Sequence, residues 1–337
     1  MVHFPTVYRG PSTGDDGNRY YYDVILQILG DAERGCVVLL DPDGAIDREI
    51  EQAIAAWPPR HKKRVQLLRA QLKKRHRLIT LASSARAAGC RRSGCAAAAG
   101  VAACSAAETP WVILPDSCAA GASCLTPTRR VLRIDEYTTS ELVERVRRLD
   151  VRHIPAETPL AAFETEVIRP LFRYTKHVKV FDRWIGRSML EANLRGDERP
   201  NWFLTSLAWL FDQFAVWSAP RDGRLFEVTT GIRIDSPQSR SVGIQISRQF
   251  AEWARELTAR HGPDGPVLQL RVKEEAAGRE LPHDRFLITD QIALNVTGGF
   301  DLLRGARGRQ WVREATLSQE REPGAIELGF RARPDLR

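Results

Sequence analysis

His283 and Arg285 are the residues of this chain whose types and spacing best suit chemistry on a bound ligand. They stand two positions apart before the apolar run 286–288, and Asp290 follows that run. In an extended strand, residues two positions apart point to the same face of the sheet. We therefore expect His283 and Arg285 to face one ligand together. Two donor groups on one face suit a tetrahedral anion, such as a phosphodiester.

Two glycines extend this cluster beyond the next predicted strand, 291–296. Gly298 and Gly299 follow that strand, and Asp301 comes two residues later. Glycine lets backbone approach a ligand closely, and backbone N–H groups in such a turn can bind an anion. We expect Gly298 and Gly299 to form a backbone wall that binds phosphate.

These residues resemble the signature of the phospholipase D superfamily, in which His-x-Lys-x4-Asp is followed by Gly-Ser-x-Asn. This chain has Arg285 in place of lysine, Gly299 in place of serine and Asp301 in place of asparagine, with one extra residue before the glycine. The His-Asp-Arg version with a Gly-Phe-Asp ending is more similar to the phospholipase D-like C-terminal domain of MIT-domain proteins and its bacterial relatives. The resemblance includes the segment 178–186 and covers roughly 165–332.

The resemblance implies a phosphodiesterase mechanism that needs no metal or other cofactor. His283 would attack phosphorus and form a phosphohistidine, Arg285 would clamp the phosphate, and Asp290 would be a supporting carboxylate. Some relatives bind lipid head groups and do not cut them. The bacterial relatives further imply a nuclease-like effector within a multi-component defence system.

Catalysis of this kind needs a second histidine to protonate the leaving group. His177 and Lys179 form a second His-x-Lys, but Trp184 stands where the family spacing has aspartate. Two alternatives remain. Two chains could pair their motifs across a twofold axis, which makes a homodimer an expected state. The pocket could also bind a phosphate-bearing ligand without turnover, as a scaffold or adaptor.

Two departures from the family pattern favour recognition over turnover. Arg285 offers a planar fork that grips phosphate with two hydrogen bonds, whereas lysine is a point charge. Asp301 would repel a phosphodiester unless it is protonated or paired with a neighbour such as Arg304. Arg183 is a further phosphate-binding candidate, because ligands of open α/β sheets lie beyond the carboxyl ends of strands. Alternatively, Asp182 and Arg183 form a structural ion pair that caps the following helix.

A competing enzyme class is indicated by Asp41-Pro42-Asp43-Gly44 after an apolar strand. This segment resembles the Asp-x-Asp-Gly of haloacid dehalogenase-type phosphatases, which use magnesium. Asp-Pro-Asp-Gly is also an ordinary turn sequence.

The charge of the chain indicates anionic partners. The net charge is +8 and the isoelectric point is near 9.4, which favours nucleic acid or anionic lipid without choosing between them. Of the two, we expect nucleic acid. The segment 60–77 places apolar residues at helical spacing and carries nine lysines and arginines. It predicts a basic amphipathic helix, either a solvated face or a contact for phosphates. The predicted contact residues are Arg69, Lys73, Lys74 and Arg77.

The cysteines do not predict a metal site. Five of the six lie in an Ala/Gly/Ser-rich insertion near 82–126, at spacings that match neither zinc ligand pairs nor a tight disulfide scaffold. No secretory signal and no segment apolar enough to span a bilayer is recognised, so we expect a soluble cytoplasmic protein.

The order of predicted elements indicates an α/β protein with two α/β halves. We expect an N-terminal domain of unknown role at 1–155 and a phospholipase D-like domain at 160–337, a mixed sheet flanked by helices. Thr138 and Glu141 have the spacing of a capping box. Strands are predicted at 36–40, 111–114, 131–134, near 178, and at 225–229, 267–272, 285–289, 291–296 and 325–330. Helices are predicted at 45–56, 60–77, 160–173, 202–217 and 237–260, with another that ends near 149.

Overall fold

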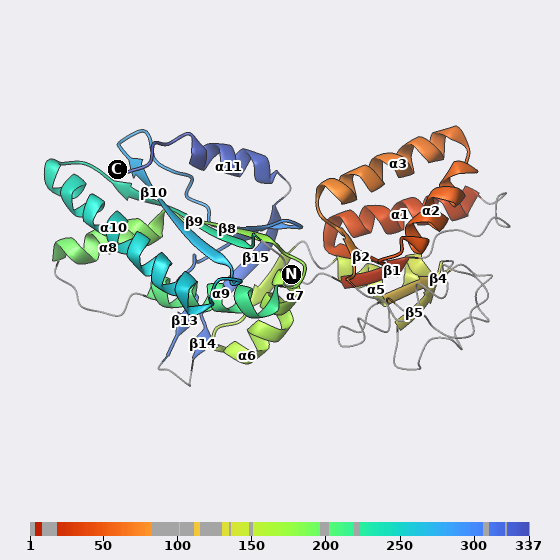
Figure 1. The fold of residues 1–337 in the computed structure, drawn as a ribbon, viewed down its shortest axis with the longest axis horizontal. Coiled ribbons are helices and arrows are strands. Elements are labelled where there is room, and N and C mark those ends of the chain that lie inside the picture. The colour runs from red at the N-terminus through yellow and green to blue at the C-terminus, as the bar shows by residue number, and fades with distance from the viewer. Residues whose placement is uncertain are drawn as a thin grey trace. The chain divides into compact units, whose positions relative to one another are not determined.

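The protein is a mixed α/β protein, which confirms the predicted fold class (Figure 1). It is seen in a computed structural model that divides into two compact units, Val2–Leu149 and Asp150–Arg337. The residues that the structure describes are 4–8, 19–82, 101, 111–114, 130–134, 136–147, 151–195, 202–218, 223–305, 310–320 and 322–336.

The N-terminal unit contains a sheet of parallel strands in the order β3-β2-β1-β4-β5. Its most deeply buried described strand is β2, whose five residues Cys-Val-Val-Leu-Leu are all buried. β-Branched and aliphatic side chains on both faces are typical of a strand covered by helices on two sides. The strands are β1 Phe4–Tyr8, β2 Cys36–Leu40, β3 Leu78–Thr80, β4 Trp111–Leu114 and β5 Arg130–Arg133.

The helices of this unit connect its parallel strands. β1 and α1 were not predicted, because their sequence begins with a polar and aromatic stretch. The predicted capping box is wrong: Ser140 Oγ, and not Thr138, accepts from the Val143 backbone N–H at 3.3 Å, and Thr138 lies in the preceding turn η3. The helical elements are α1 Arg19–Gly35, α2 Ala45–Ala55, α3 Pro59–Lys74, η3 Tyr137–Thr139 and α5 Glu141–Arg147.

The C-terminal unit is built on a seven-stranded mixed sheet in the order β10-β9-β8-β11-β12-β15-β6. Strands β8, β9 and β10 are parallel, and the remaining pairs are antiparallel. A small sheet of β13, β14 and β7 lies apart from it. The strands are β6 Val151–Ile154, β7 Thr158–Pro159, β8 His177–Phe181, β9 Leu225–Arg233, β10 Val267–Glu275, β11 Phe286–Thr289, β12 Ala293–Val296, β13 Leu303–Arg304, β14 Trp311–Val312 and β15 Ala315–Glu320.

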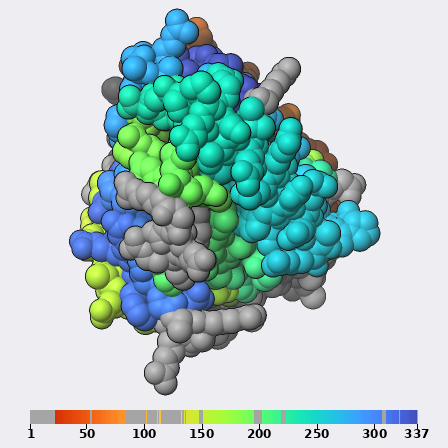
Figure 2. Space-filling model, turned by 90° about the vertical axis from the view of Figure 1, so that its left-hand side faces the viewer, coloured from red at the N-terminus to blue at the C-terminus, as the bar shows by residue number. Residues whose placement is uncertain are grey.

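Most helices of the C-terminal unit cover one face of this sheet. Val178, Val180, Phe226 and Val228 on that face are fully buried. Two predicted helices, α9 and α10, have the predicted bounds, and α8 (green) and α10 (teal) form part of the surface in Figure 2. The helical elements are α6 Leu160–Phe163, η4 Glu164–Ile168, α7 Arg169–Phe172, α8 Trp184–Arg195, α9 Trp202–Trp217, α10 Pro237–Arg260 and α11 Pro323–Arg331.

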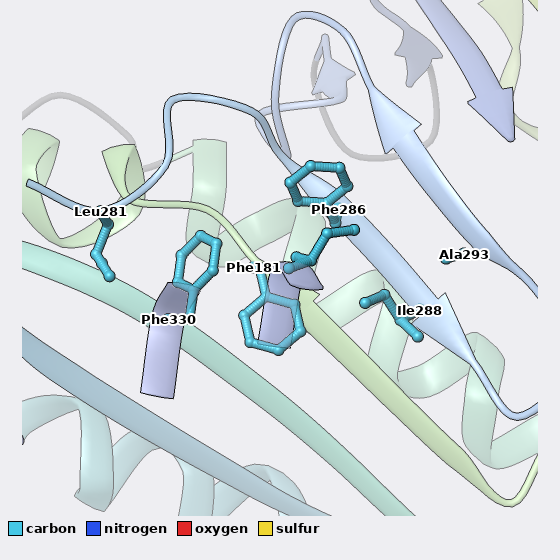
Figure 3. Close-up of a cluster of buried hydrophobic side chains, with 7 residues drawn as sticks. Phe181, Leu281, Phe286, Ile288, Ala293 and Phe330 are labelled. Carbon is cyan, nitrogen blue, oxygen red and sulfur yellow. The ribbon is translucent and has the colours of Figure 1, made fainter. Parts of the chain in front are cut away.

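On the opposite face of the sheet, α11 packs over the centre. Figure 3 shows Phe330 of this helix against Phe181 of β8, with Phe286 and Ile288 of β11 beside them. The Phe181 and Phe330 ring centroids are 4.7 Å apart. The predicted strand 325–330 is therefore wrong. Its apolar residues that become buried, Ile326 and Phe330, are four positions apart, the spacing of one helix face.

No described helix is both long enough and apolar enough to cross a bilayer.

Candidate phosphate-binding site

The candidate site lies in loops beyond the carboxyl ends of the parallel strands β8 and β10. His283 and Arg285 belong to the segment that precedes β11, which begins at Phe286. The expectation that they share a face of a strand is therefore wrong. They are instead brought to the residues after β8 by the pairing of Phe286 with Phe181. We call the group Asp182, Trp184, His283, Arg285 and Gly299 the Arg285 site.

Asp182 is the centre of this site. Its carboxylate is fully buried and accepts from the Trp184 backbone N–H at 2.9 Å, which caps the start of α8. It also accepts from the Phe300 backbone N–H at 3.2 Å, which fixes the loop after β12. Arg285 Nε lies 3.8 Å from Asp182 Oδ1. One buried carboxylate thus connects three chain segments and provides the nearest counter-charge for Arg285.

Burial raises the pKa of Asp182 from 3.8 to about 6, against the lowering effect of its two backbone hydrogen bonds and of Arg285. Because the folded-state pKa exceeds the unfolded one, the folded protein binds more protons between these two values. Asp182 therefore stabilises the fold fully below about pH 4 and loses that contribution as pH rises through about 6, by roughly 3 kcal/mol in total.

We expect the stability difference between wild type and Asp182→Asn to shift against the wild type as pH rises from 4 to 7. Urea unfolding of both proteins across this range measures it. A difference that does not change with pH would contradict the raised pKa. Other carboxylates cancel in the comparison, because both proteins contain them.

Arg183, a predicted phosphate ligand, is buried and paired inside the protein. It is fully buried, and its Nε lies 3.2 Å from Oε1 of Glu275, which is also fully buried. Its Nη1 donates to the Leu281 carbonyl at 3.0 Å. Glu275 Oε1 also accepts from the Leu281 backbone N–H at 2.7 Å. The pair is thus structural, and it holds the end of β10 against the segment that leads to His283.

The hydrogen bond of His283 determines which of its nitrogens is free. Arg183 Nη1 lies 3.0 Å from His283 Nε2. A guanidinium has only donors, so Nε2 must be the acceptor and the proton of the neutral ring is on Nδ1. The lone pair of Nε2 is therefore occupied. His283 is exposed, but in this arrangement it has no free nucleophilic nitrogen.

Trp184 belongs to the site and Arg187 lies beside it, and neither was predicted as a functional residue. The half-buried Trp184 ring has the Arg187 guanidinium carbon 4.9 Å from its centroid and that of Arg285 5.8 Å from it. The His283 ring is 6.0 Å away. The Arg183 guanidinium carbon is 5.5 Å from the same centroid, so one indole makes cation–π contacts with three arginines. A signal was present in the sequence, because Arg187 follows Trp184 by three positions in a helix, the spacing of one face.

The two glycines shape the site, and the N–H of Gly299, one half of the predicted backbone wall, is used within the turn. Gly299 N–H donates to the Val296 carbonyl at 3.3 Å within the turn, so it is not free for an anion. Both glycines have positive φ, +91° at Gly298 and +86° at Gly299. A Cβ on Gly299 would lie 3.0 Å from Arg285 Nε and 3.2 Å from Asp182 Oδ2. The absence of a side chain at Gly299 makes room for Arg285.

Gly299→Ala is expected to destabilise the protein by about 1–3 kcal/mol, because alanine is strained at positive φ and would push Arg285 out of place. Gly278→Ala is the matched control, since Gly278 also has positive φ but has open space around its Cβ position. Thermal unfolding measures the stability of both variants, and oligonucleotide titration measures their affinity. If both variants bind ligand equally, the room at Gly299 does not position Arg285.

Asp301 is paired with arginines, including Arg304, the partner considered from the sequence. Its Oδ2 accepts from Arg304 Nη2 at 2.7 Å and from Arg313 Nη1 at 2.8 Å. Two arginines thus balance one carboxylate at the border of the Arg285 site.

Three predicted residues lie elsewhere in the C-terminal unit. Asp290 follows β11, at the end opposite His283, and accepts from the backbone N–H groups of Lys176 and His177 at 2.6 and 3.0 Å. His177 begins β8 at that same far end, with Nδ1 3.7 Å from Asp290. Lys179 Nζ donates to Glu327 of α11. The predicted second half-site is therefore separated from His283, and Asp290 connects the end of β11 to the start of β8.

The predicted basic helix is present as α3. Two of its four predicted contact residues are paired within the protein. Arg77 is fully buried beyond the helix end and donates to the carbonyls of Ala32 and Cys36, and burial lowers its pKa to about 10. Arg69 pairs with Asp47 and Glu51. Lys73 and Lys74 are exposed and remain candidates for nucleic-acid or lipid contact.

Asp41 has a structural role that accounts for its sequence context. Its two oxygens accept from the backbone N–H groups of Ala45 and Ile46 at 2.8 Å each, at the start of α2. The carboxylate is buried. This is the ordinary turn-and-cap interpretation of Asp-Pro-Asp-Gly.

In the part of the chain that the structure describes, no group of three or more histidine, cysteine or acidic residues is arranged to hold a metal ion. Cys36 is buried in β2, and the other cysteines lie outside the described residues, as does most of the predicted insertion. No protein-family model and no curated protein matches the sequence.

Proposed function

We propose that the C-terminal unit binds a phosphodiester, in the first place that of nucleic acid, at the Arg285 site and does not hydrolyse it. The observation that carries this proposal is the contact between Arg183 and His283 Nε2. It occupies the nitrogen lone pair that an attack on phosphorus would use. It also fixes the imidazole as a hydrogen-bond donor through Nδ1.

Arg285 is the ligand-binding group in this proposal. Its side chain is about a quarter exposed, at 28%, although its Nε is buried beside Asp182. The buried Asp182 lies behind it, which offsets part of the charge and holds the guanidinium toward the outside. Planar guanidinium groups bind phosphate oxygens in pairs. Arg285 and the His283 Nδ1–H are thus two donors for one phosphate.

Nucleic acid is favoured over lipid by the aromatic component of the site. A partly exposed indole between two arginines provides a stacking surface beside a cation, which suits a base next to its phosphate. The positive net charge of the chain supports either anionic partner.

A binding experiment distinguishes these ligands. Labelled single-stranded DNA, RNA and vesicles containing phosphatidylserine are titrated with the full chain in EDTA at several salt concentrations. We expect the oligonucleotides to bind, with affinity that falls steeply as salt rises. Binding to vesicles in preference to oligonucleotides would replace nucleic acid by lipid. Absence of binding to all three would refute the proposal.

Hydrolysis by a pair of chains is the second candidate. His283 is exposed, so another copy could approach it and supply the missing second imidazole. This alternative predicts a homodimer that cleaves nucleic acid in EDTA. It also agrees with the nuclease-like defence effector that the sequence resemblance implies.

A further inference from the structure

A second polar cavity lies on the α11 face of the C-terminal sheet, beside the aromatic cluster of Figure 3. Its volume is about 210 Å³. Phe181 and Phe330 form its apolar side, and β8, β9, β10 and α11 supply charged side chains. We call it the Lys179 cavity; its lining residues are Lys179, Phe181, Glu227, Thr229, Arg271, Lys273, Glu327, Phe330 and Arg331.

Cations outnumber carboxylates in this lining by four to two. Arg271 pairs with Glu227 at 2.9 Å across neighbouring strands. Lys273 pairs at 2.7 Å with Asp335, which is not a lining residue. The two remaining cations, Lys179 and Arg331, both hold Glu327. The cavity therefore concentrates positive charge around one carboxylate.

Glu327 is held as a bound anion would be held. Lys179 Nζ lies 2.8 Å from each of its two oxygens, and Arg331 Nη2 lies 2.9 Å from Oε2. Charge-assisted contacts of this kind are those that bind a phosphate.

We infer that the Lys179 cavity is a binding site for a small phosphate-bearing molecule, and that the Glu327 carboxylate occupies the place of the phosphate in this structure. An incoming phosphate displaces the carboxylate toward solvent and takes over Lys179 and Arg331. The helix need not leave, because Phe330 and Ile326 hold it to the sheet independently of Glu327. This site shares no residue with the Arg285 site, so the inference does not rest on the proposed function.

A simple structural ion pair is the competing explanation, and substitution of Glu327 separates the two. Partly exposed ion pairs contribute little to stability, so Glu327→Gln is expected to fold. If Glu327 competes with a ligand, Glu327→Gln removes the competitor and phosphate binds more tightly. If Glu327 only connects α11 to the sheet, the substitution leaves phosphate affinity unchanged.

The test is calorimetric titration of the full chain with sodium phosphate against sodium chloride at matched ionic strength. We expect Glu327→Gln to bind phosphate about tenfold more tightly than wild type, which corresponds to about 1.4 kcal/mol. Lys179→Met should abolish the binding in the Glu327→Gln background, and Arg285→Ala should leave it unchanged.

Unchanged or undetectable phosphate binding in Glu327→Gln would overturn the inference. So would binding that survives Lys179→Met but is lost in Arg285→Ala, because it would then belong to the Arg285 site. Loss of oligonucleotide binding alone tests the proposed function and does not affect this inference.

Discussion

Replacing Arg285 by alanine is expected to weaken oligonucleotide binding by about ten- to a hundredfold, since a hydrogen bond to a charged group contributes about 1.5–3 kcal/mol. Arg285 Nε is buried 3.8 Å from Asp182 Oδ1, so the ligand contact that the substitution removes is that of the outer part of the guanidinium. The affinity of Arg285→Lys should lie between those of wild type and Arg285→Ala, because lysine keeps the charge but loses the planar fork. Equilibrium binding to a labelled single-stranded oligonucleotide measures all three proteins.

Arg255→Ala is the control for this prediction. Arg255 is an exposed arginine near the C-terminal end of α10, outside the Arg285 site, and its removal changes the net charge by the same amount. If both variants weaken binding equally, the effect comes from total charge and the Arg285 site is not the ligand contact.

Glu275→Ala is expected to lower the free energy of unfolding by about 3–5 kcal/mol, because it leaves Arg183 buried without its counter-charge. The two side chains are 0% and 1% exposed, so water cannot replace the missing carboxylate. Glu252→Ala on α10 is the control, since Glu252 is exposed and its loss should cost little. Urea unfolding measures both.

Replacing both members of the Arg183–Glu275 pair has a different expected result from replacing one. Arg183→Met with Glu275→Leu removes both charges, and we expect it to recover much of the stability that Glu275→Ala loses. If Glu275→Ala costs less than about 1 kcal/mol, the ion pair is not the element that supports the site.

Periodicity was sufficient for the helices that bury one regular face. Both α9 and α10 have the predicted bounds. Periodicity failed for α11, because a short amphipathic segment with two buried apolar residues does not distinguish a helix from a strand. The predicted strand 267–272 also ended three residues before β10 does, because the polar run Lys273-Glu274-Glu275 continues the strand without apolar side chains.

The place of the candidate site was predictable, but its internal contacts were not. One phosphate site was predicted from His283, Arg285 and the glycine turn, and these residues lie together in the structure. The sequence could not reveal that Arg183 is buried against Glu275, because that contact joins residues 92 positions apart. The sequence also could not show that Lys179 and Arg285 belong to different sites. The face of the sheet to which a strand residue points depends on the pairing register of its strand.

The central claim is that the Arg285 site binds a phosphodiester without cutting it, and one measurement tests it most directly. An end-labelled single-stranded oligonucleotide is incubated with wild type, His283→Ala and Arg285→Ala in EDTA, and binding and strand length are determined on the same samples. We expect wild type to bind the oligonucleotide and leave it intact, and Arg285→Ala to bind it about ten- to a hundredfold more weakly. Cleavage by wild type that disappears in His283→Ala would contradict the claim.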